Sequence, residues 1–228
     1  MSDLIFELPG GGRALFTQRT DGNLSSVAGP NHKQGETARE RIRERIGARK
    51  IIRGYQVHGT HVRRVRELPE PLPPGTRPDD ADGQATCVPG LATLVLAADC
   101  LPVAIGCEGA VAAVHAGWRG LAGGVLEEGA AAVRELAPGA TELGAVIGPG
   151  AGPCCYEVGP EVREALGLPV GEGKARIDLR ALARERLLAA GVAHIEDVAA
   201  CTICDERFFS YRREGAQSGR MAGLAWLS

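Results

Sequence analysis

The sequence predicts a single globular domain that contains both strands and helices. Its 228 residues suit one domain with a substantial core, and 44% of them are hydrophobic. Two short apolar runs bounded by turn residues, Leu91–Ala98 and Val111–Val114, are consistent with buried strands. Two segments, 36–46 and 121–136, show the apolar spacing of amphipathic helices. We therefore treat residues 1–228 as one domain.

The first third of the chain begins with a predicted hairpin over residues 6–17. Pro9–Gly12 would form its turn, and a polar loop that contains Arg19 follows. In the helix predicted over 36–46, Ile42 and Ile46 lie four residues apart on one face. A strand is expected over 51–57, followed by a proline-rich surface loop over 68–82.

The second half of the chain has clear helix and strand signals. The helix over 121–136 has one apolar face and stops before Pro138-Gly139, and a strand is expected over 143–147. The glycine-rich loop 148–159 that follows lacks the Gly-Lys-Ser/Thr ending of a P-loop, so it does not indicate an NTPase. Asp178 is placed to cap a helix over 179–190, which Gly191 would end. A final strand is expected over 221–227.

Charge and composition argue against several classes of partner. The formal net charge is -2, and the arginine run over 39–53 is interleaved with glutamates, which favours a solvated helix face over a nucleic-acid surface. No apolar run approaches the roughly 20 residues of a membrane span, and the N-terminus does not resemble a signal peptide. The seven cysteines are odd in number and unevenly spaced, which indicates free thiols in the cytoplasm.

Reactive residues follow the two apolar runs of the central stretch 91–120. Asp99-Cys100 follows the first run and His115 follows the second, so two neighbouring strands would bring a thiol and an imidazole to one sheet edge. His58 also follows an apolar run. One cysteine and two histidines form a three-ligand set that leaves the fourth position of zinc open. Taken singly, each of these side chains could equally be a packing residue.

Two further cysteine pairs occur in the chain. Cys201 and Cys204 form a CxxC, but a structural zinc site would need two more ligands. Cys154 and Cys155 are adjacent rather than two residues apart, so they do not supply the usual second half. The pattern favours packed thiols over a metal or redox site.

Eight motifs, in order along nearly the whole chain, resemble those of the YfiH family, also called the laccase-domain or multicopper polyphenol oxidase family. The motifs are GYQVHGTHV (54–62), ADG (81–83), AADCLPV (97–103), AVHAGWRGL (113–121), IGPGAGPCCYEVG (147–159), IDLRALARERL (177–187), CTICDERFFSYRREG (201–215) and GRMAGLAWL (219–227). HAGWRG and GPCC are the specific ones. The N-terminal part departs from the family, because the stretch 19–31 does not reproduce its Arg-x-Gly-Gly-Val-Ser and Asn-Leu-Gly motifs. We therefore expect the substrate preference to differ.

The resemblance implies a compact α+β domain with mixed β-sheets flanked by helices. It also implies a zinc site of His58, Cys100 and His115, the three residues singled out above. The implied activities are phosphorolysis of adenosine, inosine, guanosine and S-methyl-5′-thioadenosine, and deamination of adenosine, in the cytoplasm. The partners would be purine nucleosides and phosphate, with no nucleic acid or membrane, and the chain would be a monomer or a homodimer.

These reactions make different demands on the site. Deamination needs a carboxylate that shuttles protons, and Asp99 is the first candidate and Glu157 the second. Phosphorolysis needs cationic donors for phosphate, a role that Arg19 and Arg119 could fill through charge-assisted hydrogen bonds.

Three other functions remain open. A copper-dependent polyphenol oxidase would need several histidine-rich copper sites, whereas the chain has five histidines. A cysteine hydrolase could use Cys100 with His115. A non-catalytic module could bind a nucleotide-sugar cell-wall precursor.

Overall fold

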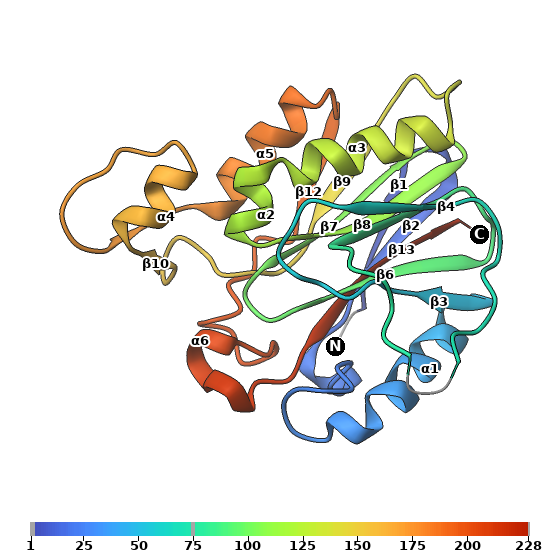
Figure 1. The fold of residues 1–228 in the computed structure, drawn as a ribbon, viewed down its shortest axis with the longest axis horizontal. Coiled ribbons are helices and arrows are strands. Elements are labelled where there is room, and N and C mark those ends of the chain that lie inside the picture. The colour runs from blue at the N-terminus through green and yellow to red at the C-terminus, as the bar shows by residue number, and fades with distance from the viewer. Residues whose placement is uncertain (1–2, 74–75, 228) are drawn as a thin grey trace.

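Two mixed β-sheets pack face to face in the computed structural model, which describes residues 3–73 and 76–227 (Figure 1). The first sheet contains, in spatial order, β1 (Leu4–Leu8), β2 (Gly12–Phe16), β13 (Met221–Leu227), β6 (Leu91–Ala97) and β3 (Lys50–Ile52). The second contains β12 (His194–Asp197), β9 (Gly144–Ile147), β7 (Leu101–Cys107), β8 (Ala110–Ala116), β5 (Gly83–Thr86) and β4 (Val62–Val65). A short separate pair joins β10 (Glu157–Val158) to β11 (Ala175–Arg176).

Helices cover the outer faces of both sheets, which gives four layers (Figure 1). The longer helices are α1 (Gly35–Arg45) on the first sheet and α3 (Val125–Leu136) with α5 (Leu179–Ala189) on the second. The shorter ones are α2 (Trp118–Gly123), α4 (Pro160–Ala165) and α6 (Tyr211–Glu214). Small side chains such as Ala104, Ala113 and Ala225 lie in the core between the sheets. The expected α+β fold with mixed sheets is confirmed.

Several local predictions are confirmed. The opening hairpin forms, with Leu8 opposite Gly12 across the predicted turn. The Asp178 carboxylate accepts hydrogen bonds from the backbone N–H groups of Arg180 and Ala181 at 3.0 Å each, so Asp178 caps α5 as expected. Gly191 has φ +77° just beyond that helix. These features follow from contacts within a few residues, which is why the sequence reveals them.

The expected pairing of two neighbouring strands around the central stretch is wrong. β6 belongs to the first sheet and β8 to the second, and β7, which was not predicted, is the actual neighbour of β8. All seven residues of β7 are buried, so the strand lacks the alternation that marks a half-exposed strand. Cys100 and His115 are therefore brought together by the pairing of β7 with β8, and not by pairing of the two predicted strands.

Two element boundaries also differ from the prediction. The helix predicted over 121–136 is two helices, which meet at Gly124 because its φ of +93° interrupts the helical backbone. The strand predicted over 51–57 ends at Ile52. Beyond Ile52, the Gln56 side chain makes hydrogen bonds of 2.7 Å to both the N–H and the carbonyl of Leu96 in β6. In a longer strand, the backbone of this segment would have made these bonds. The loop over 68–82 is confirmed, except that residues 74–75 lie outside the described residues.

Within the described part of the chain, no helix has both the length and the apolar character that crossing a membrane requires.

Candidate active site

Three segments bring His58, Cys100 and His115 together: the loop after β3, the turn between β6 and β7, and the end of β8. One possible ligand atom from each side chain lies within 4.8 Å of the others. The two imidazole rings meet edge to face, with their centroids 4.9 Å apart. The set that the sequence singled out is therefore one cluster in the fold.

Strand pairing places Cys100 beside His115. Cys100 immediately precedes β7, in which Pro102 pairs with His115 of β8. His58 arrives from the loop after β3, where it has a φ of +61°. This left-handed conformation is uncommon for a residue with a side chain, so the surrounding contacts must hold it.

Asp82 supplies those contacts, and the sequence reasoning gave it no role. Its fully buried carboxylate accepts backbone N–H bonds from Val57, His58 and Gly59 at 3.1, 3.0 and 2.7 Å. It also bonds His115 Nδ1 at 2.8 Å. A single carboxylate thus fixes the His58 turn and orients the His115 ring with Nε2 available to a metal, the arrangement typical of metal-binding histidines. The ADG motif (81–83), one of the eight that resemble the family, is the one sequence signal for this aspartate.

The electrostatics of the cluster favour a thiolate. Burial opposes ionisation of Cys100, but His115 and His58 outweigh it and lower the pKa of the thiol to about 6. Burial likewise favours a neutral His115 ring, yet the Cys100 and Asp82 charges raise its pKa to about 9. Thiolate is the form of cysteine that binds metals.

Gly117 lets the backbone come close to the three side chains. A Cβ at this position would lie 3.1 Å from both Cys100 Sγ and His58 Cδ2. With φ -75° and ψ 166°, the residue has a backbone conformation that alanine readily adopts. Glycine therefore avoids crowding of Cys100 and His58 at this position, and its backbone freedom is not needed.

We expect Gly117→Ala to weaken metal binding at this candidate site, tested with zinc, roughly tenfold, because a displaced side chain binds a metal less well. Competition with a chromophoric chelator measures the affinity. Gly139→Ala is the matched control, because a Cβ there meets no atom within 4 Å. Equal zinc affinity for the two variants would show that a side chain at position 117 does not displace Cys100 or His58.

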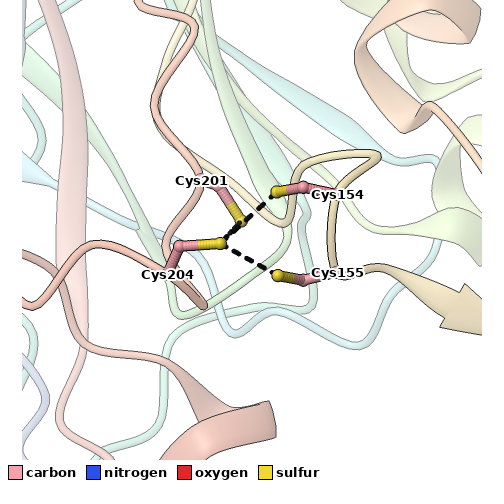
Figure 2. A group of neighbouring side chains, drawn as sticks. All are labelled: Cys154, Cys155, Cys201 and Cys204. Atoms are coloured by element: carbon pink, nitrogen blue, oxygen red, sulfur yellow. Dashed lines mark hydrogen bonds between the residues drawn. The ribbon is translucent and has the colours of Figure 1, made fainter.

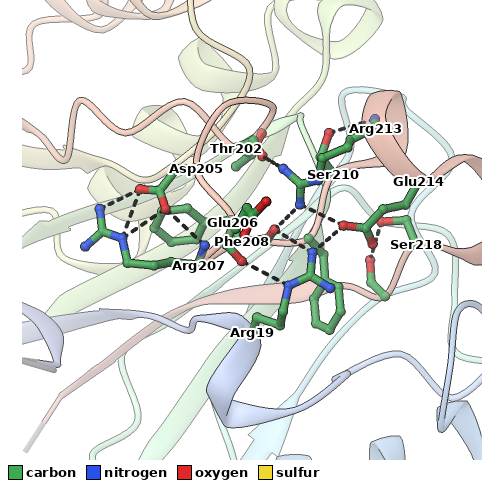
Figure 3. A network of polar contacts seen from close by, with 12 residues as sticks. Arg19, Thr202, Asp205, Glu206, Arg207, Phe208, Ser210, Arg213, Glu214 and Ser218 are labelled. Atoms are coloured by element: carbon green, nitrogen blue, oxygen red, sulfur yellow. Dashed lines mark hydrogen bonds and ion pairs between the residues drawn. The ribbon is translucent and has the colours of Figure 1, made fainter.

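Arg19, predicted as a phosphate donor, is engaged within the protein (Figure 3). Its Nε and Nη2 donate to the carbonyls of Glu206 and Phe208 at 3.1 and 3.0 Å, and it forms an ion pair with Glu214. The guanidinium also lies 4.4 Å from the centroid of the Phe209 ring. Arg19 thus positions the 206–214 segment, and its role toward phosphate stays a prediction.

Asp99 and Glu157, the proposed proton shuttles, differ in setting. Asp99 lies beyond the end of β6, so strand alternation does not set its direction relative to Cys100. Its two carboxylate oxygens accept hydrogen bonds from the Thr202 hydroxyl and the Arg212 backbone N–H, both at 2.7 Å. Glu157 is exposed, and its carbonyl accepts from Arg212 Nη1 at 2.9 Å.

Arg119 presents an exposed cation at the start of α2. Its guanidinium stacks on the Trp118 ring, 4.2 Å from the centroid.

Tyr156 is buried. Its burial, and to a smaller extent the charge of the nearby Cys100, raises the pKa of its phenol to about 12, so the hydroxyl stays protonated at neutral pH.

Cys201 and Cys204, interpreted from the sequence as packed thiols, contact a second pair of cysteines that the spacing along the chain did not indicate. Cys154 and Cys155 lie beside them, and the four sulfur atoms are within 4.8 Å of one another (Figure 2). The fold supplies the second pair of cysteines from a loop about 50 residues away, which spacing along the chain could not reveal.

Comparison with known proteins agrees with the motifs. A family model described as "Multi-copper polyphenol oxidoreductase laccase" matches residues 12–228. The chain belongs to this family. Within the family, a Xylella fastidiosa protein (strain Temecula1) named purine nucleoside phosphorylase is 40% identical over 96% of this chain and 88% of its own length. The Shigella flexneri purine nucleoside phosphorylase YfiH is 37% identical over the full length of both chains.

Solved structures of the family share the fold. Neisseria meningitidis protein NMB0706 superposes with a TM-score of 0.84 at 34% identity and covers 100% of both chains. YlmD from Geobacillus stearothermophilus gives a TM-score of 0.82 at 28% identity, over 95% of this chain and 92% of that one. The expected YfiH-like domain is confirmed.

Proposed function

We propose that the chain is a zinc-dependent purine nucleoside phosphorylase that also deaminates adenosine. The observation that carries this proposal is the His58–Cys100–His115 cluster anchored on Asp82, in a chain similar over almost its whole length to proteins named purine nucleoside phosphorylase. The substrates would be adenosine, inosine, guanosine and S-methyl-5′-thioadenosine. The seven free cysteines support a cytoplasmic location.

The donor set fits zinc. Two imidazoles and one thiolate are ligands that zinc prefers, and three protein ligands are the number typical of a catalytic site. The bond between the Asp82 carboxylate and His115 Nδ1 fixes the ring in the way that a carboxylate beside a zinc-binding histidine does. When bound, zinc supplies a Lewis acid at the fourth, open position.

In phosphorolysis, a phosphate oxygen forms a bond to C1′ of the ribose while the C1′–N9 bond breaks. The bonding electrons leave with the purine, which takes up a proton. Cationic donors must hold the phosphate against the sugar. Arg119, an exposed arginine two residues after Gly117, is our first choice for this role, and Arg19, which is bound to the 206–214 segment, is the second.

In deamination, a proton must move from the attacking water to the leaving ammonia. The Asp99 carboxylate, adjacent in sequence to Cys100, is our first choice for this group and Glu157 the second. The bonds from Thr202 and from the Arg212 backbone hold the Asp99 side chain in place.

A copper-dependent phenol oxidase is the second candidate, because the description of the family model names that activity. It is disfavoured by the ligands. Among residues 3–73 and 76–227, two groups of side chains could hold a metal, and one of them contains histidine. A multicopper centre needs several histidine-rich sites.

The proposal is tested by incubating zinc-loaded protein with adenosine, with and without phosphate, and separating the products chromatographically. We expect adenine and ribose-1-phosphate only when phosphate is present, and inosine in both samples. Absence of any product in both samples, with zinc bound, would contradict the proposal and favour a binding module.

A further inference from the structure

Four cysteines form a second cluster, built from two loops that leave the same end of neighbouring strands. Cys154 and Cys155 lie in the loop after β9, and Cys201 and Cys204 lie in the loop after β12, which pairs in parallel with β9 (Figure 2). Cys204 Sγ is 2.9 Å from Cys155 Sγ, 3.4 Å from Cys154 Sγ and 3.6 Å from Cys201 Sγ. The four thiols thus face a common point at the protein surface.

The spacing of the sulfurs matches a single metal ion. Zn–S bonds of about 2.3 Å in a tetrahedron place the sulfurs about 3.8 Å apart. The three contacts to Cys204 range from 2.9 to 3.6 Å, slightly shorter than this spacing, and all four sulfurs lie within 4.8 Å of one another. In an iron–sulfur cluster the thiolates bind different irons, so they lie further apart.

The backbone around the cluster suits thiolate ligands. The N–H of Gly152 donates to Cys201 Sγ at 3.2 Å, and the N–H groups of Ile203 and Cys204 also bond this sulfur. Such donors stabilise negative charge on sulfur. A Cβ at Gly152 would lie 3.0 Å from Cys201 Cβ, so glycine permits the close approach of the two loops.

We propose that Cys154, Cys155, Cys201 and Cys204 bind one Zn²⁺ as a closed tetrathiolate site, separate from the His58–Cys100–His115 set. Four protein ligands leave no open position, so this site is structural. Soft thiolates select zinc over magnesium or calcium. The proposal does not depend on the reaction that the other cluster performs.

Zinc at this position would join two loops that support the active site. Backbone hydrogen bonds already link them, with Thr202 N donating to the Gly150 carbonyl at 3.0 Å. The Thr202 hydroxyl in turn holds the Asp99 carboxylate next to Cys100. The metal would thus fix the two cysteine loops relative to Asp99, which directly precedes Cys100 of the first cluster.

The test is metal content, measured by plasma mass spectrometry on the full chain after dialysis against a weak chelator. We expect Cys201→Ser to hold one zinc fewer per chain than the unmodified protein. Cys87→Ser is the matched control, because Cys87 is half-buried and belongs to neither cluster; it should lose none. Because each variant is compared with the unmodified protein, the result is the same whether or not the His58 cluster holds zinc.

A second measurement requires no cysteine variant. In His58→Ala, which keeps all four cysteines, added Co²⁺ should give the intense charge-transfer and d–d absorption of tetrahedral sulfur coordination at one equivalent. No such absorption, unchanged zinc in Cys201→Ser, or a disulfide between the loops in the freshly purified protein would each overturn the proposal.

Discussion

Cys100→Ser should lose one zinc per chain and reduce phosphorolysis of adenosine on the order of 10³-fold. Serine is not ionised at neutral pH, whereas the two histidines hold the pKa of the Cys100 thiol at about 6. The variant thus replaces a thiolate ligand with a neutral hydroxyl. A bound metal contributes several kcal/mol to the stabilisation of a transition state, and about 4 kcal/mol corresponds to that change in rate. Initial rates with excess phosphate, together with metal content, provide the measurement.

Cys87→Ser again serves as the control for replacing a half-buried thiol outside the cluster. Metal content and phosphorolysis rate together distinguish a role of Cys100 as a metal ligand from a role in the reaction itself. If Cys100→Ser loses its zinc but keeps the full rate, the metal is not part of phosphorolysis. If it keeps its zinc and loses the rate, Cys100 contributes to the reaction in another way than as a metal ligand.

Asp82→Ala should destabilise the protein by about 4 kcal/mol, since hydrogen bonds to a charged group contribute about 1.5–3 kcal/mol each and their effects overlap. The variant removes the acceptor of three backbone N–H groups and of the His115 ring at once. For a domain of this size the melting temperature should fall by roughly 8–16 °C. Zinc affinity should fall about 10–100-fold, because the carboxylate orients a ligand. Thermal unfolding and chelator competition measure the two effects.

Asp82→Asn distinguishes charge from shape. It keeps an oxygen that can accept hydrogen bonds, so it should unfold closer to the unmodified protein, yet its zinc affinity should still fall. Asp79→Ala, an exposed aspartate in the same loop, is the control and should change neither property. A melting temperature for Asp82→Ala equal to that of Asp79→Ala would show that the four hydrogen bonds of Asp82 do not stabilise the fold.

The residues of the first cluster could be found from the sequence because each stands beside a local signal. Cys100 and His115 follow apolar runs, and both runs are strands in the fold. What brings these two residues together could not be found in that way. β7 is buried throughout and contains Pro102 and Gly106, so its pattern does not distinguish it from a loop between two better strands.

The sequence by itself determined the elements whose signals are local: the opening hairpin, the amphipathic helix α1, the capped helix α5 and the three candidate metal ligands. Only the tertiary structure decided which sheet each strand joins, that Asp82 supports His58 and His115 from 24 and 33 residues away, and that two cysteine pairs about 50 residues apart face each other. The reason is physical. Caps and helical faces arise from contacts within a few residues, whereas a buried carboxylate or a thiol cluster depends on how distant loops pack.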